Sequence, residues 1–308
     1  MKIIATRKIE KAESDHNLCL WRSIEHPIMK RYARLNRILA FGLLAAMVLV
    51  PVGQTAQAQG KSKEESLTPS VFQAAGLTGD SIQSTVDAFR AALGNPNNGN
   101  KTPPPDRSGH REINWDGGNP SVTTTTAPIT PFKTFLDTRG AQFTTPGFGL
   151  SQATPSGLSA LFNNPTYNTS FSTFSPSRLF TPVGSNVTEA LFFLPATNGS
   201  IPAAVRGFGA VFTDVDQPDG SGPSKKRGNR GASTLIEYFG ADGKVLFSSF
   251  VPASPGDASL SFFGVVFDEP LITRVRITTG DTAPGPDDDV NQDIVMMDDF
   301  IYGEPQPY

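Results

Sequence analysis

The sequence contains very little cysteine and histidine. Its only cysteine, Cys19, and two of its three histidines, His16 and His26, lie near the N-terminus, so His110 is the only histidine after residue 58. We therefore expect residues 59–308 to lack disulfides, a thiol nucleophile, a cysteine-ligated zinc ion and a lipid-modified cysteine. His110 stands next to Arg111, and we expect it to be a surface residue.

Long apolar runs are also scarce. The one run, Ile38 to Val52, is shorter than the roughly 20 residues that a helix needs to cross a bilayer. A basic cluster precedes it (Lys30, Arg31, Arg34 and Arg37), and Ala56-Gln57-Ala58 follows it as a signal-peptidase site. This pattern predicts a signal peptide, cleavage after Ala58 and secretion without a permanent membrane anchor. A retained anchor helix is the alternative, and we expect translation to start at Met29 rather than Met1.

Positive charge is in short supply after the predicted cleavage site. Residues 59–308 contain 17 Lys and Arg against 25 Asp and Glu, a net charge of −8, which argues against nucleic acid as a partner. The chain has 29 Gly and 26 Pro, too many for a coiled coil or a helical bundle. Its 22 Phe residues suit an apolar core.

Three segments can be distinguished: residues 1–58, residues 59–105 and residues 106–308. In the second, one amphipathic helix is predicted over Asp80 to Gly94, with Asp80 as N-cap and Gly94 as the C-terminal stop. Its apolar face consists of Ile82, Val86, Phe89 and Leu93. A linker rich in Asn and Pro follows, up to residue 105.

The third segment consists of short apolar runs separated by Gly, Pro, Asn and Asp, which is typical of an all-β sandwich or barrel. Eight strands are predicted: Arg111–Asp116, Glu189–Leu194, Val205–Asp216, Thr234–Phe239, Lys244–Val251, Leu260–Phe267, Thr273–Thr279 and Asp293–Tyr302. Ala241-Asp242-Gly243 predicts a tight hairpin between two of them. Residues 123–177 lack strict alternation, and we assign them to irregular strands and long loops.

An acidic cluster follows the third predicted strand. Asp214 and Asp216 would lie on one face of that strand and Asp219 in the turn after it, an oxygen-only set that Ca²⁺ prefers. The spacing does not match an EF-hand, because Pro218 and Lys225 occupy two of its ligand positions. The alternative is an ordinary turn, neutralised by the basic residues 225–227.

A second acidic feature lies in the last predicted strand. Asp298 and Asp299 should point to opposite faces, so one of them must lie inside, where an unpaired charge is costly. Arg274 and Arg276 could pair with it, as could backbone N–H groups or a bound cation. Two interpretations follow: an ordinary buried ion pair, or a Ca²⁺ site shared with the first acidic cluster. Residues 287–289 would be further Ca²⁺ donors in the second case; otherwise they are a solvated loop.

The segment His110–Asp116 alternates in polarity. Trp115 lies on one face with Ile113, and Glu112, Asn114 and Asp116 lie on the other. A polar face beside a Trp could bind sugar, but Trp115 could equally be a core residue. Glu112 and Asp116 are the pair on which we base an alternative function, glycoside hydrolysis. Residues 59–308 contain no nucleophile elbow, zinc-protease motif, phosphate loop or dinucleotide fingerprint.

Four segments carry a family resemblance: HREINWD at 110–116, GFGAVFTDVD at 207–216, LSFFGVVF at 260–267 and DDFIYGEP at 298–305. Together they resemble a group of uncharacterised secreted bacterial proteins. Residues 205–303 are also similar to the jelly-roll domains of exosortase-sorted surface proteins and to galactose-binding-like modules. The resemblance implies a jelly-roll-like antiparallel β-sandwich that binds or displays rather than catalyses. It carries over no functional residues, and the missing apolar helix and basic tail at the C-terminus predict release or non-covalent retention.

We therefore expect a secreted, non-catalytic binding or surface-structural module. Its partner would be a glycan or an extracellular matrix component, and Ca²⁺ could stabilise it. A secreted glycan hydrolase is the alternative. A hydrolase requires a concave site with two opposed carboxyl groups, whereas a binding sandwich needs only a shallow face or a loop edge.

Overall fold

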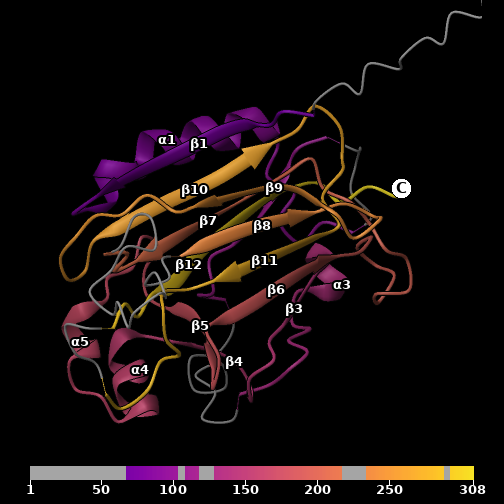
Figure 1. Cartoon of the computed structure of the whole chain (residues 1–308). Coiled ribbons are helices and arrows are strands. Elements are labelled where there is room, and N and C mark those ends of the chain that lie inside the picture. Colours follow the sequence, from indigo (N-terminus) through magenta and orange to yellow (C-terminus); the bar gives the residue numbers. More distant parts are fainter. Residues whose placement is uncertain (1–66, 103–107, 118–127, 217–233, 288–291) are drawn as a thin grey trace, which may run out of the picture. The chain divides into compact units, whose positions relative to one another are not determined.

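The computed structural model describes residues 67–102, 108–117, 128–216, 234–287 and 292–308. The chain divides into two units, Met1–Ser62 and Lys63–Tyr308, and all described residues belong to the second. This unit is mostly β structure and contains two antiparallel sheets, which is consistent with the predicted β-sandwich (Figure 1).

The larger sheet has seven strands. Six follow one another in the order β1-β10-β7-β12-β5-β4, and β2 also pairs with β12. The strands are β1 (Ser70–Gly76), β2 (His110–Ile113), β4 (Gly149–Ala153), β5 (Leu179–Val183), β7 (Gly207–Thr213), β10 (Leu260–Val266) and β12 (Met296–Gly303).

The smaller sheet has five strands in the order β3-β6-β11-β8-β9. They are β3 (Ala141–Thr144), β6 (Val187–Phe192), β8 (Leu235–Phe239), β9 (Val245–Phe250) and β11 (Arg274–Thr278). In β11, Val275 and Ile277 are buried while Arg274 and Arg276 are partly exposed. This alternation shows that one face of the sheet is packed and the other meets water.

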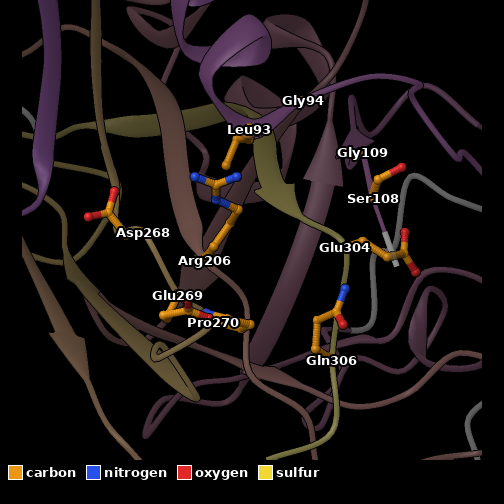
Figure 2. Close-up of a pocket in the computed structure, with 10 residues that line it drawn as sticks. All are labelled: Leu93, Gly94, Ser108, Gly109, Arg206, Asp268, Glu269, Pro270, Glu304 and Gln306. Carbon is orange, nitrogen blue, oxygen red and sulfur yellow. The ribbon is translucent and has the colours of Figure 1, made fainter. Parts of the chain in front are cut away.

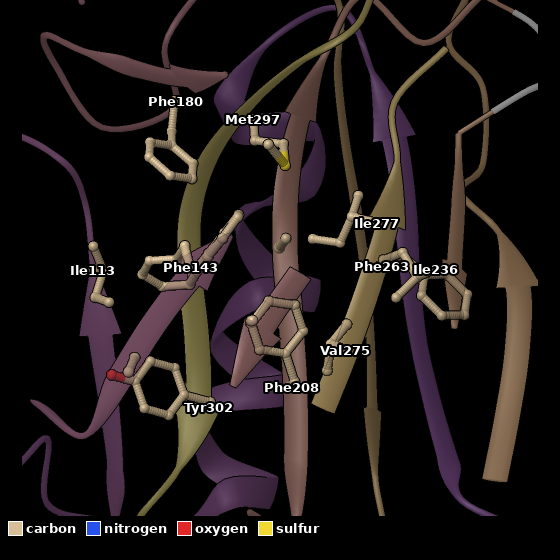
Figure 3. Packing of buried hydrophobic residues seen from close by; sticks show 14 of the residues in the cluster. Ile113, Phe143, Phe180, Phe208, Ile236, Phe263, Val275, Ile277, Met297 and Tyr302 are labelled. Carbon is tan, nitrogen blue, oxygen red and sulfur yellow. The ribbon is translucent and has the colours of Figure 1, made fainter. Parts of the chain in front are cut away.

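The core lies between the two sheets (Figure 3). Phe208 and Phe300 from the larger sheet meet Ile236, Val275 and Ile277 from the smaller one. Strands β7, β10 and β12 are buried over their whole length, because helix α1 covers the other face of the larger sheet. This double burial explains their nearly continuous apolar sequences.

Helix α1 (Gly79–Leu93) lies along β1 and β10 (Figure 1). Its buried residues are those of the predicted apolar face. Phe89 packs over Gly209 and Gly264, which face each other on β7 and β10; a Cβ on either glycine would lie within 3.0 Å of the Phe89 ring. The two glycines therefore let the helix approach the sheet closely.

Three short helices complete the described structure. They are α3 (Leu136–Arg139), α4 (Pro155–Phe162) and α5 (Tyr167–Ser170). Leu158, Phe162 and Tyr167 from α4 and α5 form a separate apolar cluster with Leu179 of β5 and Met296 of β12.

All eight predicted strands are present, although most are shorter than predicted. The helix and the hairpin are confirmed: Gly94 has φ 97° at the helix end, and Gly243 has φ 75° in the turn. The predicted N-cap is wrong, because Thr78 holds that position and Asp80 lies in the first turn. Residues 128–177 are more regular than predicted, with two strands and three short helices, and β1 was not predicted.

Candidate functional site

A polar cleft of about 370 Å³ lies beside the pairing of β2 with β12. Its lining comes from α1, the loop after it, β2 and the residue that follows, α3, the segment before β5, and β12. We call it the Asp299 cleft; its lining residues are Arg90, Asn97, Gly99, Glu112, Asn114, Arg139, Ser175 and Asp299. Every one is polar or glycine.

A β-bulge in β12 brings the two adjacent aspartates to the same side. Met297 pairs with Phe212 and Phe300 with Ala210, so three steps along β12 match two along β7. Asp298 Oδ2 accepts a hydrogen bond from the N–H of residue 174 at 2.6 Å, and Asp299 Oδ1 accepts one from the Ser175 hydroxyl. The prediction that these carboxylates point to opposite faces is therefore wrong, since it assumed an unbroken strand.

The two aspartates form a buried acid pair. Burial and the neighbouring Asp299 carboxylate raise the pKa of Asp298 well above its usual range. Burial also raises the pKa of Asp299, against the hydrogen bond from Ser175, which favours its ionised form. Among the described residues, no side chain or backbone group forms a hydrogen bond with Asp298 Oδ1. Burial next to a second carboxylate thus favours the protonated form of Asp298.

The cation beside this pair is not the predicted one. Arg274 and Arg276 both bind Glu189 on the outer face of the smaller sheet, at 2.7 Å each. The guanidinium near the acid pair is that of Arg90, whose Nη2 lies 3.9 Å from Asp299. Arg90 lies in the last turn of α1, so only the packing of that helix brings it to β12.

Glu112 is held from two sides. Arg90 donates from Nε and Nη2 to its two carboxylate oxygens at 2.9 and 3.0 Å, and His110 Nε2 lies 2.9 Å from Oε1. Burial opposes ionisation of Glu112, but the hydrogen bonds from His110 and Arg90 outweigh it and lower its pKa. His110 is buried, with Nδ1 at 2.7 Å from the Gly94 carbonyl, so the prediction of a surface histidine is wrong.

Trp115 does not line the cleft. It is fully buried, stacks on Phe180 at 3.7 Å between ring centroids, and donates from Nε1 to the Asp298 carbonyl at 2.9 Å. Trp115 has φ 63°, a rare conformation for a bulky residue, at the point where β2 has ended. Its interpretation as a core residue is confirmed, and no sugar can stack on it.

Of the predicted carboxylate pair, Glu112 and Asp116, only Glu112 lies in the cleft. Asp116 Oδ1 accepts hydrogen bonds from the backbone N–H groups of Ser177 and Arg178, so this side chain fixes a loop. Glu112 does line the cleft, and the second carboxylate there is Asp299.

The four described carboxylates among the five predicted for Ca²⁺ do not form one group. Strand β7 ends at Thr213, and Asp214 has φ 70°, so Asp214 and Asp216 do not share a strand face as predicted. Asp216 accepts a hydrogen bond from the Gly256 N–H. Asp219, the basic residues 225–227 and residues 288–289 lie outside the described residues. Within the described ranges, no three acidic, histidine or cysteine side chains could share a metal ion. The calcium site stays a prediction.

Two further pockets differ from the Asp299 cleft. One, of about 340 Å³, places Arg206 near Asp268 and Glu269 at the C-terminal end of α1 (Figure 2). The other, of about 560 Å³, lies on the outer face of the smaller sheet over Glu189, Glu237 and Arg276. Neither holds a buried acid pair.

Comparisons with protein-family models, curated proteins and solved structures give no match to this chain. None of the helices in the described part of the chain is long and apolar enough to cross a membrane.

The sequence did not point to Arg90, Arg139 or Ser175. Arg90 and Arg139 lie in the last turns of α1 and α3, where cations are common, and Ser175 belongs to a Ser-rich stretch. Only their tertiary neighbours mark them as parts of a site.

Proposed function

We propose that this chain is a secreted, non-catalytic binding module with a jelly-roll-like β-sandwich, and that it binds a glycan in the Asp299 cleft. Secretion rests on the predicted signal peptide, and the jelly-roll assignment on the sequence resemblance. An extracellular matrix component would be recognised through its glycan.

The lining of the cleft by polar residues and glycine, with no hydrophobic side chain among them, is the observation that carries this proposal. Small-molecule sites are mostly lined by apolar side chains, with a few polar groups among them. A ligand gains binding energy from such polar residues only if it offers hydrogen-bonding groups around its whole edge. The hydroxyls of a sugar meet this requirement. The volume of about 370 Å³ is at the lower end of the roughly 300–1,000 Å³ found for ligand sites.

The cleft is also fixed before any ligand arrives. Glu112 is held by Arg90 and His110, and Asp299 by Ser175. Such preorganisation reduces the entropic cost of binding. Because Arg90 binds both oxygens of Glu112, this carboxylate is poorly placed to act as a nucleophile or base, which favours binding over hydrolysis.

A glycan array probed with the full chain tests the proposal. We expect binding of at least one glycan class, and a loss of about tenfold or more in affinity for Asn114→Ala, which removes an exposed amide of the cleft. Asn168→Ala, an exposed asparagine of α5 outside the cleft, is the matched control. Absence of binding to every glycan, or equal losses in both variants, would contradict the proposal.

Hydrolysis of a glycan is the second candidate function. It is favoured by the opposite pKa directions of Glu112 (lowered) and Asp299 (raised) in one cleft, as acid and base assignments require. Release of reducing ends from the bound glycan, abolished in Asp299→Asn, would support it. Binding without release would leave the non-catalytic proposal in place.

A further inference from the structure

Arg139 differs from the other charged residues of the Asp299 cleft in its partners. Its Nε donates to Asn100 Oδ1 at 2.7 Å, and its Nη1 donates to the Glu112 carbonyl. Both acceptors are neutral. Arg139 forms no ion pair with any described carboxylate, whereas Glu112 and Asp299 both lie beside Arg90.

The surroundings of Arg139 make this isolation costly. Burial lowers the pKa of its guanidinium and outweighs the attraction of Tyr302 and Glu112, which raise it; the positive charge of Arg111 lowers it further. Arg111 cannot share its own counterion, because Glu304 accepts hydrogen bonds from Arg111 Nε and Nη2 within the core. A negative charge next to Arg139 would therefore relieve both the desolvation and the repulsion.

The guanidinium is also held in one orientation. It lies over the Phe135 ring at 5.1 Å from the centroid, and Asn100 fixes its Nε side. Its Nη2 has no hydrogen-bond acceptor among the described residues, while Arg139 lines the open cleft. A fixed guanidinium edge with free N–H groups matches the two oxygens of a carboxylate.

Building on the proposed function, we propose that the glycan bound in the Asp299 cleft carries a carboxylate, as a uronic acid does, and that Arg139 binds this carboxylate. The hydroxyls of the same sugar would meet the amides and the hydroxyl of the lining: Asn97, Asn114 and Ser175. An acidic peptide fits less well, because no hydrophobic residue lines the cleft to bind the apolar side chains of a peptide.

Calorimetric titration of the full chain with two probes tests this proposal. Digalacturonate and its methyl ester have the same sugar rings, but only the first is charged. We expect the wild type to bind the acid about tenfold or more tightly than the ester, as expected for hydrogen bonds to a charged group. Arg139→Gln should lower the affinity for the acid far more than the affinity for the ester, and should therefore abolish most of this preference.

Two further variants serve as controls. Arg206→Gln changes an arginine that lines another pocket and should retain the preference. Arg139→Lys keeps the charge but loses the planar fork, and should retain part of the preference. A melting temperature equal to that of the wild type would exclude misfolding of Arg139→Gln. If Arg139→Gln unfolds, the preference for the acid is compared between Arg139→Lys and the wild type, and an undiminished preference in Arg139→Lys would contradict the proposal.

The outcomes separate this inference from the proposed function. Equal affinity for acid and ester, with Asn114→Ala weakening both, would overturn the carboxylate inference and leave the glycan site standing. Binding of neither probe, together with an empty glycan array, would overturn both. Tighter binding of a poly-glutamate peptide than of digalacturonate would overturn the glycan class.

Discussion

Arg111 and Arg139 are close enough to repel each other, yet their surroundings are opposite. Arg111 is fully buried and makes five hydrogen bonds, two to Glu304 and three to the carbonyls of Gly99, Lys101 and Thr138. Arg139 makes two side-chain hydrogen bonds, both to neutral acceptors. The first arginine joins the loop after α1 to β2 and the C-terminal segment. The second retains donors for a partner outside the chain.

The acids near β12 show the same contrast. Glu304 is paired with Arg111 in the core, whereas Asp298, also buried, forms no ion pair with a described cation and has a pKa that burial and Asp299 raise. A fully satisfied buried group stabilises one fold, while a partly satisfied one costs stability. We infer that the Arg111–Glu304 pair is structural and that the bulge at Asp298 and Asp299 is kept for the cleft.

The largest expected effect comes from breaking the structural pair. Arg111→Met leaves Glu304 buried without a counterion, and we expect a loss of about 3–5 kcal/mol in the free energy of unfolding, measured by urea denaturation. The double variant Arg111→Met/Glu304→Leu should recover much of this loss, because the unpaired charge is gone. A loss below about 1 kcal/mol for the single variant would show that the pair is not structural.

A smaller effect of opposite sign is expected at Asp298. An acid whose pKa is raised on folding destabilises the folded state above the unfolded pKa, because the unfolded chain ionises freely there and the folded chain does not. The cost grows until the pH passes the folded pKa, and it disappears below the unfolded pKa. Asp298→Asn should therefore raise stability at pH 8 by roughly 1–2 kcal/mol, with the gain vanishing below about pH 4.

Thermal unfolding of both proteins from pH 4 to 8 measures this change. The result also addresses calcium. If a chelator lowers the melting temperature of the wild type but not of Asp298→Asn, a cation rather than a proton lies between the two aspartates.

Arg139→Gln should change stability far less than Arg111→Met does. Removing an arginine without a counterion abolishes two hydrogen bonds but also a desolvated charge, so we expect a change within about 1 kcal/mol by urea denaturation. A loss as large as that of Arg111→Met would make Arg139 a second structural arginine and remove the contrast between them.

The smallest effect is expected at Asp87, the exposed partner of Arg90. The pair has the helical i,i+3 spacing at 3.0 Å, and such pairs contribute about 0.2–0.5 kcal/mol. Asp87→Ala should thus leave both stability and glycan affinity nearly unchanged. A clear drop in affinity would mean that Arg90 needs Asp87 to hold Glu112 in place.

Local patterns were sufficient to predict the eight strands and α1, because alternation and helical spacing are written in neighbouring residues. They failed at β12, where Asp298 and Asp299 share a side through a bulge set by pairing with β7. The missed strand β1 pairs with β10, a tertiary context that its own residues do not encode.

The candidate site was predictable only in part. Glu112 and Asn114 follow from the alternation in the predicted strand at residues 111–116. Arg90 and Arg139 come from helices that are separate in sequence from β12, and no short-range pattern connects them with Asp299. The predicted partners Arg274 and Arg276 lie on the other sheet, which residue spacing alone does not reveal.

The most direct test of the account is a crystal structure of the chain with digalacturonate. The account predicts a sugar ring in the Asp299 cleft with its carboxylate about 2.7–2.9 Å from the Arg139 guanidinium nitrogens and its hydroxyls against Asn114 and Ser175. A sugar bound instead in the Arg206 pocket or on the outer face of the smaller sheet, with the Asp299 cleft left to water, would contradict it.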